Sequence, residues 1–303
     1  MSEPTSSPAT DSRSQISDPT SSVYALVTPV RNEEAFIGRT IASVVKQTTL
    51  PVEWIIVSDG STDGTNDIIK AAIAKHPWIR IIELPPRSKP SWTAVVDNTT
   101  LGIKSLESES YEFLGLLDSD LEFQADYFER LIHEFRKDPK LGLAGGVAID
   151  IGLPKTDLPR NRRDVPGALQ FYRRACFEEM GGLVPIPEGG WDGVSCALAR
   201  KCGWETRLVT ELIVDHLKPR NVNEGGALRR KWQMGVRDYA IGYHPVFETV
   251  KCISRVTQPP LLLGSICWWL GYCSALVGRR RRILSRDLVN YIRAEQMKRL
   301  FKA

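Results

Sequence analysis

Strand-like and helix-like segments alternate along residues 23–150, and this alternation constrains the fold more than any other feature of the sequence. Short apolar runs indicate strands, and longer segments with apolar residues three or four positions apart indicate helices. The expected strands are residues 23–30, 53–57, 79–84, 111–117 and 141–149, and the expected helices are residues 33–47, 65–75, 93–106 and 125–137. This order predicts an α/β fold with a doubly wound, mostly parallel sheet.

Polar residues stand at the carboxyl ends of three of these strands. Arg31 and Glu33 follow the first strand, Asp59 closes the second, and Asp118-Ser119-Asp120 follows the fourth. Ligands of such sheets bind beyond the carboxyl ends of the strands. We therefore expect these side chains, together with Thr28, to meet at one edge of the sheet.

The acidic side chains at this edge suggest two kinds of contact. Asp118 and Asp120 are one residue apart and could hold a hard divalent cation, since Mg²⁺ and Mn²⁺ prefer oxygen ligands and leave positions for phosphate oxygens. The alternative for this pair is a solvated turn. Asp59 could accept hydrogen bonds from a nucleobase or a ribose. Its alternative is a turn or helix cap, a role that Asp63 or Ser61 fills equally well.

Three segments resemble the family-2 glycosyltransferases of GT-A fold in both order and spacing: residues 28–34 (TPVRNEE), 57–65 (VSDGSTDGT) and 116–120 (LLDSD). The resemblance is strong over residues 23–150 and looser over 160–242. It implies a nucleoside-diphosphate sugar as donor, Mn²⁺ or Mg²⁺ as cofactor, and Asp120 as a metal ligand. The nucleotide-sugar-binding residues that it implies are Thr28, Pro29, Arg31, Glu33, Asp59, Asp118 and Ser119. Lys89 is a further candidate for a phosphate contact, although residues 87–90 depart from the family pattern and a solvated loop charge is the alternative.

Sugar transfer by direct displacement also needs a group that takes the proton of the acceptor hydroxyl. Asp192, in the segment GGWDG at residues 189–193, resembles the family's catalytic acidic residue, which also begins a helix in the acceptor-binding half. The family often shows an acidic pair there, whereas Trp191 is the first member here. We expect Asp192 to be the general base, and a helix N-cap is the alternative.

Two further positions bear on the reaction. His216 follows an expected strand and matches a position that completes the metal shell in related enzymes, and an imidazole is a suitable Mn²⁺ ligand. A structural hydrogen-bonding role is the alternative. Residues 228–232 (LRRKW) depart from the QxxRW signature of processive polysaccharide synthases, because Leu228 replaces the Gln and Lys231 the Arg. This departure predicts that one sugar is added per encounter.

The predicted domain organisation has three parts. Residues 1–22 are expected to form a disordered tail, and residues 23–245 a catalytic domain with a nucleotide-sugar-binding part (23–150) and an acceptor-binding part (151–245). The second part is expected to pack onto the sheet, with helices at 168–180, 191–202 and 227–239 and a strand at 206–209. Residues 246–303 are expected to form a helical, membrane-associated tail.

The charge and the hydropathy of the tail are the reasons for predicting that it associates with a membrane. Residues 279–303 hold nine Lys or Arg and two acidic residues, a local charge of +7, although the net charge of the chain is only +4. Residues 261–277 carry no charge and precede Arg279–Arg282. An in-plane or re-entrant helix is the interpretation that we favour, and a membrane span or a core or partner-binding helix are the alternatives. Residues 289–301 could form a second, basic amphipathic helix.

Composition excludes some classes of protein. The six cysteines form no CxxC pair or Cys/His cluster, so a zinc site is not expected, and we interpret them as reduced thiols in a cytosolic setting. The basic residues are concentrated in the tail, a distribution that argues against a nucleic-acid partner. We expect a protein located in the cytoplasm, peripheral or monotopic at the inner face of the membrane.

The predicted function is inverting transfer of a sugar to a saccharide or lipid-linked acceptor in polysaccharide or glycolipid synthesis. A sugar nucleotidyltransferase is one alternative, although the segment after the first strand lacks the expected glycine-rich basic loop. A non-catalytic, membrane-tethered nucleotide-sugar binder is another. An aspartyl phosphatase is disfavoured, because it would leave Asp59 without a role and would be expected to have Thr or Val at the position of Leu121.

Overall fold

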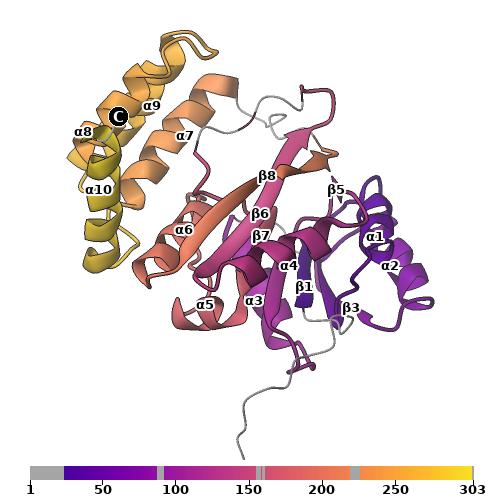
Figure 1. The fold of residues 1–303 in the computed structure, drawn as a ribbon. Helices are drawn as coiled ribbons and strands as arrows, with labels where there is room; N and C mark the ends of the chain where they lie inside the picture. The colour runs from indigo at the N-terminus through magenta and orange to yellow at the C-terminus, as the bar shows by residue number, and fades with distance from the viewer. Residues whose placement is uncertain (1–23, 87–91, 155–157, 159–160, 219–225, 302–303) are drawn as a thin grey trace, which may run out of the picture.

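An eight-stranded sheet runs through the middle of the computed structural model, which describes residues 24–86, 92–154, 158, 161–218 and 226–301 (Figure 1). The strand order is β3-β2-β1-β4-β7-β6-β8-β5. In these described residues the strands are β1 (Tyr24–Val30), β2 (Glu53–Asp59), β3 (Ile79–Leu84), β4 (Phe113–Leu117), β5 (Leu121–Glu122), β6 (Leu141–Asp150), β7 (Leu169–Arg173) and β8 (Glu205–His216).

The sheet is parallel in its first half and mixed in its second. Strands β3, β2, β1 and β4 are parallel neighbours, as the alternating pattern predicts. Strand β7 runs antiparallel to both β4 and β6, β6 and β8 run parallel, and β5 pairs antiparallel with β8. The predicted α/β sheet is confirmed, and the strands of the second half belong to the same sheet.

Ten helices lie among the described residues. They are α1 (Ile37–Val45), α2 (Thr65–Ile73), α3 (Trp92–Lys104), α4 (Tyr127–Lys137), α5 (Arg174–Glu179), α6 (Trp191–Lys201), α7 (Gly226–Ala240), α8 (Pro245–Ile253), α9 (Leu263–Val277) and α10 (Arg286–Phe301). Figure 1 shows α1 and α2 near the β3 end of the sheet and α7–α10 gathered beyond its opposite side.

The two faces of the sheet are apolar because alternate residues of each strand point to opposite sides. Tyr24 and Leu26 of β1 join a buried cluster that includes residues of α1, α2 and α4. Ala25 and Val27 join the cluster on the other face, with residues of α5 and α6. Helices on both faces explain why β1 is apolar at nearly every position, with Thr28 as the exception.

The helix predicted at residues 168–180 is wrong over its first six residues. Leu169–Arg173 forms strand β7, and only Arg174–Glu179 is helical. Leu169 and Phe171 are buried between β4 and β6, so pairing with two neighbouring strands overrides the local preference of the segment. The strand expected at 206–209 is also longer, extending to His216.

The C-terminal helices pack on one another and on α6. Residues of α10 share a buried cluster with α6, and α7 shares one with α9. Gly235 of α7 permits a close approach to α9, because a Cβ there would lie 2.0 Å from the Trp268 carbonyl oxygen. In the described part of the chain, no helix combines the length and the apolar character needed to cross a bilayer. Within residues 261–277, helix α9 has 15 residues.

Candidate active site

The carboxyl ends of β2, β1 and β4 lie side by side because these strands are parallel neighbours. Asp59 ends β2, Arg31 follows β1, and Asp118 follows β4. Arg31 Nη1 lies 4.0 Å from Asp59 Oδ2, and the Asp59 side chain is 7% exposed. The sheet thus brings the predicted strand-end groups to one edge. There the Arg31 guanidinium lies beside the largely buried Asp59 carboxylate.

The loops that follow β1 and β2 bind each other. Asn32 Oδ1 accepts a hydrogen bond from the Thr62 amide at 2.8 Å, and the Glu33 amide donates to Thr65 Oγ1 at 2.8 Å. Asp63 Oδ1 accepts from the Thr65 amide at 3.1 Å. Asp63 therefore takes the local turn role, which leaves Asp59 suited to a ligand contact.

Thr28 and Pro29 of β1 and the loop residue Lys89 are also predicted to line the nucleotide. Thr28 is fully buried, and its Oγ1 accepts from Trp54 Nε1 at 2.9 Å, so this hydroxyl is engaged within the core. Pro29 is half-buried in the same strand. Lys89 lies outside the described residues.

The acidic triplet after β4 is held by a threonine of α1. Thr40 Oγ1 donates to the Ser119 carbonyl at 2.8 Å and accepts from the Leu121 amide at 2.9 Å. Ser119 and Asp120 are buried, whereas Asp118 is half-buried. The backbone of the triplet is thus fixed from both sides, which sets the direction of its carboxylates.

His216 lies between the carboxylates of Asp120, just before β5, and Asp150, at the end of β6. Its Nε2 lies 3.5 Å from Asp120 Oδ2, and its Nδ1 lies 3.2 Å from Asp150 Oδ1. Strand β5 brings Asp120 to His216, because Leu121 pairs with His216 and the Leu217 amide donates to the Asp120 carbonyl at 2.8 Å. Asp150 is the direct register partner of His216 across β6 and β8.

The donor set at this point fits a hard divalent cation. Among the described residues, no three His, Cys, Asp or Glu side chains are arranged to hold a metal ion by themselves. Mn²⁺ and Mg²⁺ in nucleotide sites are usually held by one or two protein ligands, with phosphate oxygens and waters completing the shell. Asp120 and His216 supply such a partial set. Asp150 Oδ1 lies 3.2 Å from the other imidazole nitrogen, although that nitrogen has no hydrogen-bond partner among the described residues.

An ion pair adjoins this group. Lys218 Nζ lies 2.6 Å from Glu33 Oε1, and Glu33 Oε2 is buried and has no hydrogen-bond partner among the described residues. Burial raises the pKa of Glu33, Lys218 lowers it, and the charges of Asp120 and Asp63 raise it. Glu33 therefore belongs to the same acidic neighbourhood as Asp120, with Lys218 as its counter-charge.

Asp192 lies in the first turn of α6, at a wall of the site formed by the second half of the chain. Its Oδ2 accepts from the Gly167 amide at 3.3 Å, and its Oδ1 accepts from the Gly193 amide at 2.9 Å. The N-cap of α6 is Gly190, which adopts φ 87°. The N-cap alternative for Asp192 is therefore wrong, and its half-buried carboxylate remains available to a substrate.

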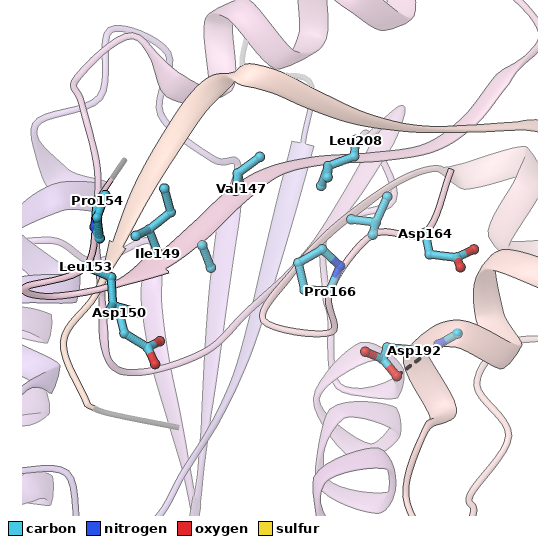
Figure 2. A pocket seen from close by; sticks show the side chains of 12 residues that line it. Val147, Ile149, Asp150, Leu153, Pro154, Asp164, Pro166, Asp192 and Leu208 are labelled. Carbon is cyan, nitrogen blue, oxygen red and sulfur yellow. Dashed lines mark hydrogen bonds between the residues drawn. The ribbon is translucent and has the colours of Figure 1, made fainter. Parts of the chain in front are cut away.

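A pocket of about 380 Å³ is lined by both Asp150 and Asp192. Asp150, Asp164 and Asp192 contribute its acidic side chains, and Val147, Ile149 and Leu208 are among its apolar ones. Figure 2 shows Asp150 and Asp192 on opposite walls, each with its carboxylate directed toward the intervening space. Asp150 thus touches His216 and also faces the cavity that Asp192 lines.

Sequence reasoning missed Asp150 and Lys218. Asp150 directly follows the strand expected at residues 141–149, so the rule that drew attention to Asp59 and Asp118 would also have selected it. Lys218 stands two residues after His216, and its contact with Glu33 joins positions 185 residues apart. No local pattern in the sequence indicates that pairing.

The family model described as Glycosyl transferase family 2 matches residues 25–190 of the chain. The chain is 25% identical over 222 residues to poly-β-1,6-N-acetyl-D-glucosamine synthase of Staphylococcus epidermidis, an alignment that covers 71% of this chain and 46% of that protein. It is 32% identical over 124 residues to hyaluronan synthase of Pasteurella multocida, covering 39% of this chain and 11% of that protein. The chain therefore spans less than half the length of these curated relatives.

Two solved structures share the fold. The mannosyltransferase PcManGT of Pyrobaculum calidifontis, in complex with GDP-Man and Mn²⁺, superposes with a TM-score of 0.58 at 16% identity, covering 94% of this chain and 83% of that one. TarS of S. aureus, in complex with UDP-GlcNAc, superposes with a TM-score of 0.52 at 15% identity, covering 72% of this chain and 66% of that one. At these identities the likeness concerns the arrangement of strands and helices.

Proposed function

The chain belongs to glycosyl transferase family 2, whose members are glycosyltransferases, and from this membership we propose that it moves a sugar from a nucleoside-diphosphate donor to a saccharide or lipid-linked acceptor. The proposal rests most directly on Asp150, which contacts His216 beside Asp120 and lines the same pocket as Asp192. The proposed cation ligands, Asp120 and His216, and the proposed general base, Asp192, would thereby share one site.

The donor would occupy the edge formed by β2, β1 and β4. Asp59 would accept hydrogen bonds from the base or ribose, with Arg31 beside it, and Asp118 would lie near the ribose. Asp120 and His216 would hold Mn²⁺ or Mg²⁺ on the diphosphate, where the cation neutralises charge on the departing group. PcManGT with GDP-Man and Mn²⁺ supports a donor and a metal of these kinds.

The acceptor would enter the pocket lined by Asp150 and Asp192. Asp192 would take the proton of the acceptor hydroxyl. At the same time the hydroxyl oxygen would form a bond to the anomeric carbon, and the bond from that carbon to the diphosphate would break. Attack from the face opposite the leaving group inverts the anomeric configuration. Gly167 and Gly193 amides hold the Asp192 carboxylate in place for this step.

The setting that we propose is polysaccharide or glycolipid synthesis at a membrane surface. The relatives named as poly-β-1,6-N-acetyl-D-glucosamine synthase and hyaluronan synthase support a saccharide acceptor. Leu228 and Lys231 replace the Gln and Arg of the processive signature, so we propose addition of one sugar per encounter. Lys231 is not equivalent to an arginine where a forked donor is needed.

A thermal-shift screen identifies the donor. We expect one class among UDP, GDP, dTDP and CMP sugars to raise the melting temperature, and the rise to require Mn²⁺. Incubation with acceptor should then release nucleoside diphosphate. Release of pyrophosphate from a nucleoside triphosphate and a sugar phosphate would instead indicate a nucleotidyltransferase. Metal-dependent binding without any turnover would indicate a nucleotide-sugar binder.

A further inference from the structure

Helices α8 and α9 and the segment that joins them carry many exposed apolar side chains, a set here called the α8–α9 face. Residues of α8 at positions 246, 250 and 253 repeat at helical spacing, as do exposed residues of α9. The described members of the face are Val246, Val250, Ile253, Leu261, Leu262, Leu263, Ile266, Trp269, Leu270, Leu276 and Val277, each between 41% and 83% exposed.

The inner side of the same helices is firmly attached to the protein. Asp238 of α7 is buried and accepts hydrogen bonds from Lys251 of α8 and Trp268 of α9, both through Oδ2, at 2.5 and 2.7 Å. Trp269 Nε1 donates to Thr249 Oγ1 at 3.2 Å and joins the two helices directly. Helices held in this way keep their apolar side chains turned outward.

The charge around the face is of one sign. Between residues 243 and 285, Glu248 is the only acidic residue, and it is fully buried and paired with Lys251 at 2.5 Å. Arg279, Arg280 and Arg281 follow the end of α9 and are exposed. An apolar face bordered by exposed arginines, without exposed acidic residues, complements a surface that has an apolar interior and anionic groups at its boundary with water.

We propose that the α8–α9 face docks in the plane of a lipid bilayer that carries anionic headgroups. The aliphatic side chains would enter the acyl boundary, Trp269 would lie at the interface, and Arg279–Arg281 would contact headgroup phosphates. A second copy of the chain is a poorer occupant, because pairing two such faces would bring like charges together. This inference goes beyond sugar transfer and requires neither donor nor metal.

Vesicle sedimentation with the full chain tests the proposal. We expect binding to phosphatidylcholine vesicles that contain phosphatidylglycerol and much weaker binding to phosphatidylcholine alone. The double variant Ile253→Glu/Ile266→Glu should lower the partition coefficient by at least about tenfold. Changing Arg279, Arg280 and Arg281 to Gln should lower binding to anionic vesicles by about fivefold per residue.

The matched control is Leu50→Glu/Leu101→Glu, which places the same charges on exposed apolar residues away from the face. It should bind vesicles like the unaltered chain, and circular dichroism should show that both variants are folded. A measurement without charge insertion uses brominated lipids, which should quench fluorescence of the unaltered chain more than that of Trp269→Phe. Equal vesicle binding by the face variant, no binding by the unaltered chain, or a dimer that the face variant dissociates would each overturn the proposal.

Discussion

Replacing Asp192 by Asn removes the group that would accept the proton and keeps the size and shape of the side chain. The amide keeps one oxygen that can accept from the Gly193 amide at 2.9 Å, and the weaker contact with Gly167 at 3.3 Å is the one at risk. Loss of one such hydrogen bond costs about 0.5–1.5 kcal/mol of stability. Loss of a general base should lower kcat by roughly 10²–10⁴-fold, equivalent to about 3–5 kcal/mol in the barrier.

The assay measures donor affinity by calorimetry and transfer by release of nucleoside diphosphate. Asp164→Asn is the control, because it removes a charge from the same pocket while Arg200 keeps Glu295 as a partner at 2.9 Å. We expect Asp192→Asn to bind donor within about twofold of the unaltered chain, and Asp164→Asn to retain most of its turnover. A kcat for Asp192→Asn within tenfold of the unaltered chain, with donor binding intact, would refute the assignment.

Three further predictions concern the metal, the packing and the pH dependence. Asp150→Asn should weaken Mn²⁺ binding in the presence of nucleoside diphosphate by about 10–100-fold, because it removes the carboxylate that lies 3.2 Å from His216 Nδ1; an unchanged titration would contradict this role. Gly235→Ala should lower the free energy of unfolding in urea by about 1–3 kcal/mol, since its Cβ would lie 2.0 Å from a carbonyl oxygen of α9, whereas Gly38→Ala, with its nearest contact at 3.7 Å, should not. Burial raises the pKa of Glu33 above its ordinary value of 4.5, so the stability that its neutral form contributes is present below 4.5 and lost as pH rises through the raised pKa. Glu33→Gln should therefore gain stability relative to the unaltered chain as pH rises from about 4 to about 8, and a parallel pair of stability curves would count against that reasoning.

The first half of the sheet, and the edge at which its polar strand ends meet, could be predicted from local patterns. Each strand there is an apolar run that ends in polar residues, and parallel strands place those ends together. This rule is enough to bring Asp59 and Asp118 to one edge. It also explains why most of the strands and site residues predicted from local patterns lie in residues 23–150.

The second half depends on contacts between distant segments. Strand β7 forms because Leu169–Arg173 fits between β4 and β6, and its own sequence favoured a helix. His216 meets Asp120 only because β5 pairs with β8. The pairing of Lys218 with Glu33 likewise depends on the complete fold. Local periodicity contains no information about such neighbours.

Titration of Mn²⁺ by electron paramagnetic resonance, with the stabilising nucleoside diphosphate present, measures whether Asp120 and His216 hold the cation. We expect one tight metal site per chain, lost in Asp120→Asn, weakened in His216→Gln and retained in Asp192→Asn. Unchanged Mn²⁺ binding by Asp120→Asn would show that the cation and the diphosphate are held elsewhere, and would contradict the site proposed at this edge of the sheet.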